Sequence, residues 1–425
     1  MIRDTLLYIL KILAKATLRR YQPIVVGITG SVGKTSAKEA IFAVLKNKFN
    51  VRRNEKNYNN EIGVPLTILG QETGGRSALR WVKVFLFGII GLFHQRNYPK
   101  VLLLEMGADR IGDIAYLLSF LRPHVGVITA IGEIPVHVEF FQDANQVAQE
   151  KSTLVRSLGE ADWAVLNFDD GRVRAMAGKT PARVLGYGFS EGATLRASHL
   201  EIHLEDLNEP FASFKVDFRG SNVPVRLKNI LGEHQLCPVL AAMAVGLTFN
   251  LNLVEIFQAL QTNYTLAPGR LRLLKGIKNS WVIDDTYNAS PSSTLAALEV
   301  LAETKGRKIA VLGDMLELGF FTEEAHRRVG QKASRVAQLL LTVGARSLFI
   351  ADEAEKNGLP REQILHFDDS WGAAGALQDL MQEGDVVLVK GSQGARMERI
   401  TKEIMAEPQR ASELLVRQDK AWLNR

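Results

Sequence analysis

The sequence has little of several features that define specialised classes of protein. Only one of its 425 residues is a cysteine, Cys237, so an internal disulfide is excluded, which fits a reducing cytoplasm. The net charge of +6 is spread along the chain without a basic block interleaved with aromatic residues. An anionic substrate explains this charge as well as nucleic acid does, and we expect no nucleic acid partner. Internal repeats and low-complexity runs are also missing. What remains is an ordinary globular composition, long enough for two or three domains.

Apolar runs long enough to cross a bilayer are missing as well. Residues 1–18 carry Arg3, Lys11 and Lys15 at helical spacing and have no small-residue cleavage site, which predicts an amphipathic helix and argues against a signal peptide. Residues 81–93 are apolar but fall short of the roughly twenty residues that a spanning helix needs. We expect both segments to pack on the protein or on each other. The alternative is shallow docking at the inner face of the membrane.

The strongest motif is a glycine-rich loop between an apolar run and a helix-favouring run. Residues 24–26 are apolar, residues 37–45 favour a helix, and between them the chain reads Thr29-Gly30-Ser31-Val32-Gly33-Lys34-Thr35-Ser36. The glycines let backbone N–H groups turn towards phosphates, the Lys34 ammonium reaches the outer phosphates, and the Thr35 hydroxyl suits Mg²⁺. The sequence therefore predicts a P-loop that binds ATP or GTP.

Further polar side chains follow the apolar strands of the first half. Glu105 ends the apolar run 101–104, where a Mg²⁺-binding acid belongs in a P-loop protein, although a cap for the next helix is the alternative. His137 follows the apolar run 125–131 and is expected at the same sheet edge. The asparagine-rich loop 57–60 either binds phosphates or shapes a turn.

The second half has its own α/β pattern, which begins after Pro268-Gly269-Arg270. Four apolar runs, 280–283, 308–312, 339–343 and 385–389, are each followed by polar residues and a helix, which predicts a second open parallel sheet. The predicted fold is α/β: a P-loop central domain with a mainly parallel sheet and a β-rich flank at 183–218, plus a C-terminal Rossmann-like domain. The predicted boundaries are an N-terminal amphipathic helix at 1–22, a central domain at 23–267 with an apolar insert at 81–97, and a C-terminal domain at 268–425.

Together these motifs resemble the Mur ligase family, ATP-dependent amide-forming enzymes of peptidoglycan synthesis. The resemblance covers residues 23–400 and includes the P-loop, the loop 57–65, Glu105-Met106-Gly107-Ala108, and Pro268-Gly269-Arg270. Asp284-Asp285-Thr286-Tyr287-Asn288-Ala289 and Gly313-Asp314-Met315-Leu316-Glu317-Leu318-Gly319 are most similar to the member that adds D-alanyl-D-alanine to the UDP-N-acetylmuramoyl tripeptide. The resemblance implies that a muropeptide carboxylate takes the γ-phosphoryl group of ATP and that the resulting acyl phosphate is attacked by an amine.

The resemblance also implies roles for single residues around the phosphates. Lys34 would stabilise the transferring phosphoryl group. Thr35 and Glu105 would hold one Mg²⁺, and His137 with a carbamylated Lys151 would hold a second.

Other implied roles concern the nucleotide and the incoming amine. Arg270 would reach the γ-phosphate and Asp285 the ribose. The remaining nucleotide-binding residues would be Gly30, Ser31, Val32, Gly33, Ser36, Asn60, His234 and Asn288, and the substrate-binding residues would be Tyr287, Lys390 and Ser392.

Three departures from the family keep other readings open. First, we expect the family's N-terminal UDP-binding domain to be missing. Second, the His-Asn-x-x-Asn pattern of the family's adenine site is replaced by His234-Gln235-Leu236-Cys237-Pro238. Third, the apolar insert lies outside the common core. We expect a cytoplasmic monomer, unless a partner chain replaces the missing domain. The alternatives are a lipid-linked muropeptide met at the membrane, another carboxylate such as a glutamyl chain on a pterin, and an inactive scaffold or partner protein.

Overall fold

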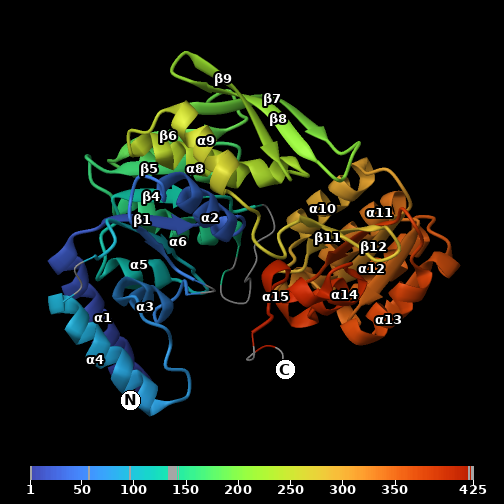
Figure 1. Cartoon of the computed structure of the whole chain (residues 1–425), viewed down its shortest axis with the longest axis horizontal. Helices are drawn as coiled ribbons and strands as arrows, with labels where there is room; N and C mark the ends of the chain where they lie inside the picture. The colour runs from blue at the N-terminus through green and yellow to red at the C-terminus, as the bar shows by residue number, and fades with distance from the viewer. Residues whose placement is uncertain are drawn as a thin grey trace.

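The chain forms two α/β units that face each other across a central gap between their ribbons (Figure 1). The computed structural model describes residues 2–55, 58–94, 97–132, 141, 143–419 and 422. These residues form two mainly parallel sheets, so the predicted α/β class is confirmed.

The first sheet combines a buried parallel part with an antiparallel flank. In the described residues its order is β2-β3-β1-β4-β5-β6-β7-β8-β9, with parallel pairing from β2 to the start of β7 and antiparallel pairing beyond. The flank extends past residue 218, where we expected it to end, because β9 pairs with β8 along its whole length. The strands are β1 (Ile24–Thr29), β2 (Val51–Arg53), β3 (Val101–Glu105), β4 (Val125–Ile128), β5 (Trp163–Asn167), β6 (Arg183–Gly188), β7 (Leu195–His203), β8 (Phe211–Phe218) and β9 (Ser221–Lys228).

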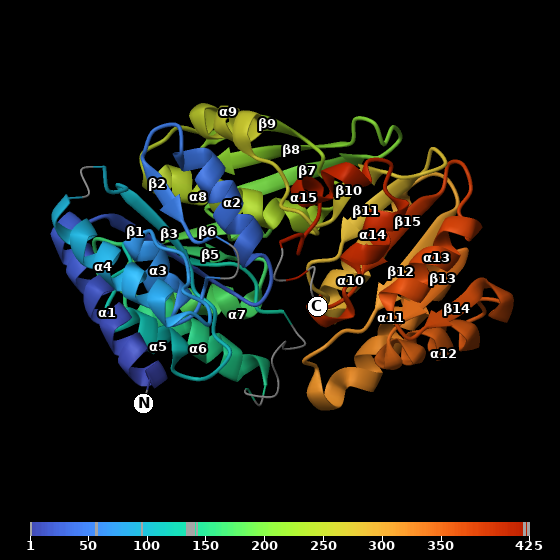
Figure 2. The ribbon, with the colours of Figure 1, turned by 60° about the horizontal axis from the view of Figure 1, so that its bottom comes forward.

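Helices cover both faces of this sheet. One layer contains α2 (Lys34–Leu45), α8 (Leu236–Thr248) and α9 (Leu253–Asn263), which share a core with alternate residues of the strands (Figure 2). The residues between them in the same strands face the other layer, because successive side chains of a strand point to opposite faces. That layer contains α1 (Ile2–Tyr21), α3 (Gly63–Leu69), α5 (Asp113–Leu118), α6 (Ala144–Arg156) and α7 (Gly171–Arg174).

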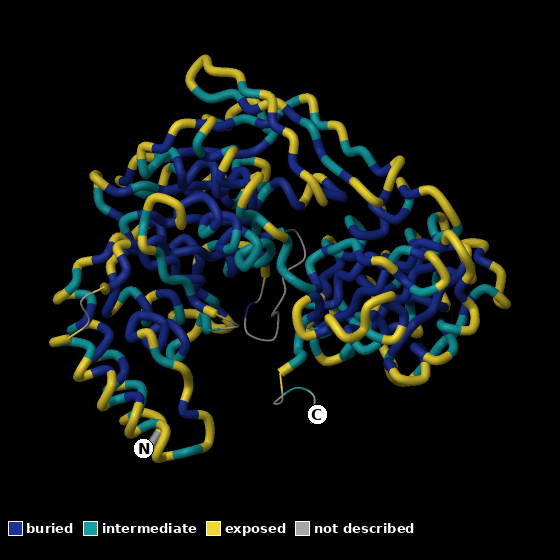
Figure 3. The backbone as a smooth tube through the Cα atoms, in the orientation of Figure 1, coloured by how far each residue is buried: buried dark blue, intermediate teal, exposed yellow. Residues whose placement is uncertain are grey.

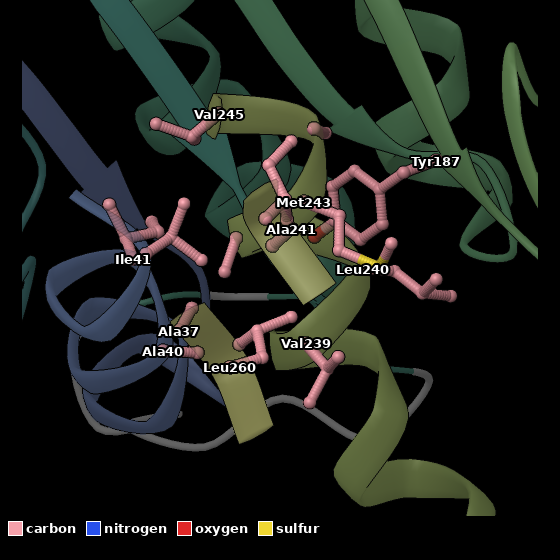
Figure 4. Close-up of a cluster of buried hydrophobic side chains, with 14 of the residues drawn as sticks. Ala37, Ala40, Ile41, Tyr187, Val239, Leu240, Ala241, Met243, Val245 and Leu260 are labelled. Carbon is pink, nitrogen blue, oxygen red and sulfur yellow. The ribbon is translucent and has the colours of Figure 1, made fainter. Parts of the chain in front are cut away.

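Small side chains gather where helix α2, which follows the P-loop, meets α8. Ala37, Ala40 and Ile41 on α2 face Val239 and Leu240 on α8 (Figure 4). Alanines let the two helices approach closely, and α8 is buried along nearly all of its length. The P-loop helix therefore packs on the sheet and on α8 through one shared core.

The second sheet has more strands than expected. Its order in the described residues is β10-β11-β15-β12-β13-β14, six strands where we expected four, because short β14 and antiparallel β10 extend its edges. The strands are β10 (Arg272–Lys275), β11 (Trp281–Asp285), β12 (Lys308–Gly313), β13 (Leu339–Val343), β14 (Ile364–Phe367) and β15 (Val386–Lys390). The helices α10 (Pro291–Glu303), α11 (Thr322–Val336) and α12 (Leu348–Lys356) pack on one face, and α13 (Ser370–Leu380), α14 (Glu398–Ile404) and α15 (Ala411–Leu414) on the other.

The two apolar segments of the first half form a pair of helices at the outside of the first unit. Helix α1 leads directly into β1, and α4 (Ala78–His94) packs beside it in both views (Figures 1 and 2). Gly88 is buried where α4 meets Leu13 of α1 and Leu69 of α3. In the part of the chain that the structure describes, every helix is too short or too polar to cross a membrane.

Helix α9 allows a test of this packing. Leu260 is 1% exposed in the core beneath α2, whereas Val254 on the same helix is 54% exposed. We expect Leu260→Ala to lower the free energy of unfolding by about 2–5 kcal/mol, because it removes buried methyl groups and leaves a cavity. Val254→Ala, the matched control, should change it by less than about 0.5 kcal/mol. Chemical denaturation of both variants measures this, and equal losses would contradict the packing.

Candidate active site

The P-loop connects β1 to α2 and is held against the neighbouring strand β4. Ser31 and Val32 donate backbone hydrogen bonds to the Ala130 carbonyl at 2.7 and 3.2 Å. A Cβ at Gly30 would lie 2.0 Å from Thr129 Oγ1, so a side chain at this position would displace the loop. Gly33 has a φ of 85°, in the left-handed region that favours glycine, and it is the N-cap of α2. The loop thus aims the N-terminus of α2 at open space.

That open space suits phosphate groups. Lys34 opens α2, and its Nζ donates to the carbonyls of Gly30 at 2.7 Å and Ser31 at 3.2 Å. Burial lowers the pKa of Lys34; the Glu105 carboxylate opposes the shift and the Arg270 guanidinium adds to it. Free N–H groups at a helix N-terminus together with a lysine form an anion site. Thr35 and Ser36 lie in the first turn of α2, as the motif predicts.

A buried carboxylate next to the P-loop joins three parts of the site. Glu105 ends β3, accepts a hydrogen bond from Thr35 Oγ1 at 3.1 Å and one from Asn59 Nδ2 at 3.2 Å, and lies 3.5 Å from Lys38 Nζ. Burial alone raises the pKa of Glu105, but the charges of Lys38 and Lys34 and the two hydrogen bonds outweigh it and leave the pKa below its ordinary value. Glu105 is therefore ionised at neutral pH.

The oxygens of Thr35 and Glu105 are suited to Mg²⁺. A hydroxyl and a carboxylate 3.1 Å apart beside a phosphate site are the hard oxygen donors that this ion takes together with phosphate oxygens. Within the described ranges no group of three or more His, Cys, Asp or Glu side chains is arranged to hold a metal ion by itself. His137, expected as a ligand of a second ion, lies outside the described residues.

Lys151 enters the same site from α6. Its side chain is buried and lines a cavity together with Lys34 and Asp109. Burial is the main reason that the pKa of Lys151 falls to about 7, and the nearby charge of Lys34 lowers it further. The carboxylates of Glu150, Asp109 and Asp113 oppose this shift without cancelling it. The Lys151 amine therefore loses its proton far more readily near neutral pH than an ordinary lysine does. Glu150 also accepts hydrogen bonds from the backbone N–H groups of Gly112 and Ile114.

The cavity itself lies between the two α/β units and has a volume of about 640 Å³. The first unit contributes the P-loop, Asn59, Asp109 and Lys151, and the second contributes residues from the carboxyl edge of its sheet. The lining residues of the second unit include Tyr287, Asn288, Leu316, Glu317, Ser392, Gln393, Arg396 and Trp422. Two of the expected substrate-binding residues, Tyr287 and Ser392, thus face the phosphate site across one space.

Two asparagines in the loop between β2 and α3 have different positions. We expected Asn60 near the phosphates, but Asn60 is exposed and its Oδ1 accepts hydrogen bonds from the N–H groups of Ile62 and Gly63 at the start of α3. Asn59 lines the cavity and contacts Glu105 instead. Sequence reasoning missed Asn59 because neighbouring loop residues point in different directions. It also missed Asp109, for which the Gly-Ala-Asp run after Glu105 was the available signal.

The segment between α9 and β10, residues 264–271, joins the two units and is called the crossover below. It carries Arg270. The Arg270 guanidinium lies 3.8 Å from the centroid of the Tyr287 ring, and its buried Nε has no hydrogen-bond partner among the described residues. Such an unpaired buried donor suits an anionic ligand. Gln235, which replaces an asparagine of the family pattern, accepts from Leu231 N at 2.7 Å and donates to the Leu271 carbonyl at 3.2 Å. This glutamine therefore anchors the crossover.

Asp285 and Lys390 form a buried ion pair. Lys390 Nζ lies 2.5 Å from Asp285 Oδ2 and 3.0 Å from the Asn288 carbonyl, and Asp285 Oδ1 accepts from Leu271 N. Neither side chain is part of the lining of this cavity or of the second cavity described next. In this structure the pair holds the 285–288 loop and the crossover in place.

A second cavity, of about 820 Å³, opens on the other side of the P-loop. It is lined by Val32 and Gly33, by His234, and by residues of α10, so it too lies between the two units. His234 is exposed to this space, yet the surrounding protein atoms keep its pKa below the ordinary value, so the ring is neutral at pH 7. The lining is more apolar than that of the first cavity, as suits a flat nucleobase.

Comparison with known proteins identifies both units. The chain matches the family model of the Mur ligase middle domain over residues 90–246 and that of the Mur ligase glutamate ligase domain over residues 269–393. It is 30% identical over 381 residues to the UDP-N-acetylmuramoyl-tripeptide–D-alanyl-D-alanine ligase of Escherichia coli K12, covering 89% of this chain and 76% of the relative. For the ligase of the same name from Bacillus subtilis the identity is 29%, over 95% of this chain and 81% of the relative.

A solved structure is also similar over most of the chain. The MurF ligase from Thermotoga maritima in complex with ADP is 28% identical and has a TM-score of 0.76. The similarity covers 93% of this chain and 83% of the other.

The pKa of Lys151 leads to a reactivity test. At pH 8 a lysine with a pKa of about 7 is about 90% neutral, whereas an ordinary lysine is less than about 1% neutral, so Lys151 should react faster with a small acylating reagent. We expect trace acetic anhydride in CO₂-free buffer to label Lys151 at least about tenfold faster than exposed Lys48, as measured by peptide mass spectrometry. Lys390 is equally buried but ion-paired, and should stay unlabelled. Equal labelling of Lys151 and Lys48 would show that the Lys151 amine is protonated.

Proposed function

Because this chain belongs to the Mur ligase family, we propose that it is an ATP-dependent, ADP-forming ligase that joins a muropeptide carboxylate to D-alanyl-D-alanine in peptidoglycan precursor synthesis. One observation carries the proposal: the inter-unit cavity brings Lys34 and Lys151 opposite Tyr287 and Ser392. A site with phosphate-binding groups on one side and polar groups on the other suits the transfer of a phosphoryl group followed by amide formation. The T. maritima ligase bound to ADP supports ATP as the phosphoryl donor.

The two cavities divide the substrates between them. The nucleobase of ATP occupies the more apolar cavity beside His234, and the triphosphate crosses the P-loop into the first cavity. The acceptor carboxylate attacks the γ-phosphorus there, the bond to the bridging oxygen breaks, and ADP leaves. The amine of the second substrate then attacks the acyl phosphate and releases inorganic phosphate. Tyr287 and Ser392 lie on the side from which the amine arrives.

Charge neutralisation is the main task of the protein in the first step. The Arg270 guanidinium lies close enough to lower the pKa of Lys34, and both cations would stabilise the phosphoryl group in transfer. Thr35 and Glu105 would hold Mg²⁺, which supplies further positive charge to the phosphate oxygens. Asn59 and Lys38 hold Glu105 in place for this purpose. The facing units exclude water from the acyl phosphate.

We also propose that Lys151 is carbamylated in the active enzyme. A neutral lysine amine adds CO₂ to give a carbamate and one proton, and the pKa of about 7 supports this reaction at neutral pH. The carbamate provides the negative charge that a second Mg²⁺ needs, and His137 would complete that site. The positive charge of Lys34 stabilises the carbamate.

The remaining details of partners and location belong to the same proposal. We propose that the enzyme works in the cytoplasm as a monomer and takes UDP-linked tripeptide as its acceptor, as the names of its relatives indicate for those proteins. A lipid-linked muropeptide is the second candidate acceptor, and the exposed apolar surface described below favours it.

The activity is tested by phosphate release from the purified chain with ATP and Mg²⁺. We expect release only when UDP-N-acetylmuramoyl tripeptide and D-alanyl-D-alanine are both present, because the acyl phosphate must be consumed before ADP production continues. Lys34→Gln should lower kcat by at least about a hundredfold, since it removes charge from the transferring phosphoryl group. Lys48→Gln is the matched control and should leave the rate unchanged, because Lys48 is exposed and pairs with Glu255.

The other outcomes separate the alternatives. Turnover only with a lipid-linked muropeptide would identify that acceptor and exclude the UDP-linked one. Binding of ATP without release for either acceptor would contradict the ligase proposal and favour a scaffold.

Carbamylation has its own test. Lys151→Ala should lower the ligase rate by at least about a hundredfold, and acetate or propionate should restore part of it by supplying a carboxylate in the vacated space. Wild-type protein in ¹³C-bicarbonate should show a carbamate carbon resonance that Lys151→Ala lacks. Lys34→Ala is the control that carboxylates should not rescue. A wild type without the resonance and a variant without rescue would show that Lys151 acts as an amine.

A further inference from the structure

Helix α4 lacks the polar face that a surface helix normally has. Its inner stripe, formed by buried Val84 and Gly88 and half-buried Trp81 and Phe85, packs on α1 and α3. The opposite face is apolar too, and between residues 84 and 93 the helix carries no charged side chain. A helix that is apolar all round is usually buried, so something must cover the outer face of α4.

The exposed apolar residues of the molecule gather at this place. The described part of the chain exposes sixteen large hydrophobic side chains, of which seven lie on α4 and two on α1. We call these nine residues the apolar face: Tyr8, Ile12, Leu79, Val82, Leu86, Phe87, Ile89, Ile90 and Phe93. In Figure 3 the yellow stretches of α1 and α4 mark this outer side of the molecule. The concentration exceeds the scattered apolar residues of an ordinary surface.

The segments that form the apolar face are rich in basic residues. Residues 2–21 and 71–94 contain eight Lys or Arg side chains and two acidic ones, an excess of six that equals the net charge of the whole chain. Arg76, Arg80 and Lys83 are all exposed at the start of α4. Long basic side chains beside an apolar helix face reach lipid phosphates while the apolar residues enter the boundary between headgroups and acyl chains.

We propose that the apolar face docks on the surface of an anionic lipid bilayer, with α4 lying in the plane of the interface. Charge complementarity favours lipid over a second copy of the chain, since an isologous contact would bring two strongly basic surfaces together. Helix α4 lies on the bilayer and does not enter it as a spanning segment, because no described helix is long and apolar enough to cross.

The docking surface is joined to the active site by a short run of chain. Tyr58 and Ile62 pack into the same apolar cluster as α1 and α4, and Asn59 between them contacts Glu105. The loop that carries Asn59 thus connects the docking surface to one wall of the cavity. The proposal does not depend on the ligase activity, which is measured separately by phosphate release in solution.

The test uses the full chain and vesicles of defined lipids. We expect it to co-sediment with vesicles of phosphatidylglycerol and phosphatidylcholine, and to do so less as salt increases. Leu86→Gln with Phe93→Gln should lower the partition coefficient at least about tenfold, because both side chains are exposed on the apolar face. Arg76→Gln, Arg80→Gln and Lys83→Gln together should lower it at least about tenfold for anionic vesicles only.

Matched controls keep the result interpretable. Val254→Gln with Leu348→Gln removes two exposed apolar residues from α9 and α12 and should leave binding unchanged. All variants should keep the wild-type midpoint of thermal unfolding and the wild-type affinity for ATP. The proposal is overturned if the wild type stays in the supernatant with anionic vesicles, if the α4 variants bind as well as wild type, or if the chain forms a dimer that Leu86→Gln with Phe93→Gln dissociates.

Discussion

The buried carboxylate of Glu105 is the point on which the rest of the site depends. It ends β3 beside β1, and it connects the helix after the P-loop, through Thr35 and Lys38, to the loop before α3, through Asn59. A charge that is 5% exposed is tolerated only when cations and hydrogen bonds surround it, so these partners are constrained in turn. The same constraint keeps an ionised oxygen ligand next to the phosphate site.

The two lysines of the cavity, Lys34 and Lys151, have different electrostatic surroundings. The charge of Lys34 is stabilised by Glu105, whereas the carboxylates near Lys151 only partly offset its burial and the charge of Lys34. Burial lowers the pKa of both lysines, and for Lys151 the nearby charge of Lys34 lowers it further, to about 7.

The second unit supplies one wall of the active-site cavity. Its sheet places Tyr287 and Ser392 opposite the P-loop, and the crossover that sets this placement is held by Gln235 and by the Asp285–Lys390 pair. Gln235 therefore has a structural role, which is to hold the crossover, and a comparison of adenine-site motifs does not reveal this role. Helices α1 and α4 belong to the same chain of contacts, since they support the loop that carries Asn59.

The sequence by itself determined the parts of the protein that depend on local pattern. The strand–glycine loop–helix spacing determined the P-loop, the alternation of apolar runs and helices determined the α/β class, and Glu105 at a strand end pointed to an ion-binding acid, because these signals lie within short stretches of chain. The tertiary structure decided what distant segments do to each other. Which of Asn59 and Asn60 faces the cavity, the pairing that buries Lys390 away from it, and the exposure of the outer side of α4 depend on packing between elements far apart in the sequence. A residue pattern predicts which face of a helix is apolar, but only the assembled fold shows whether anything covers it.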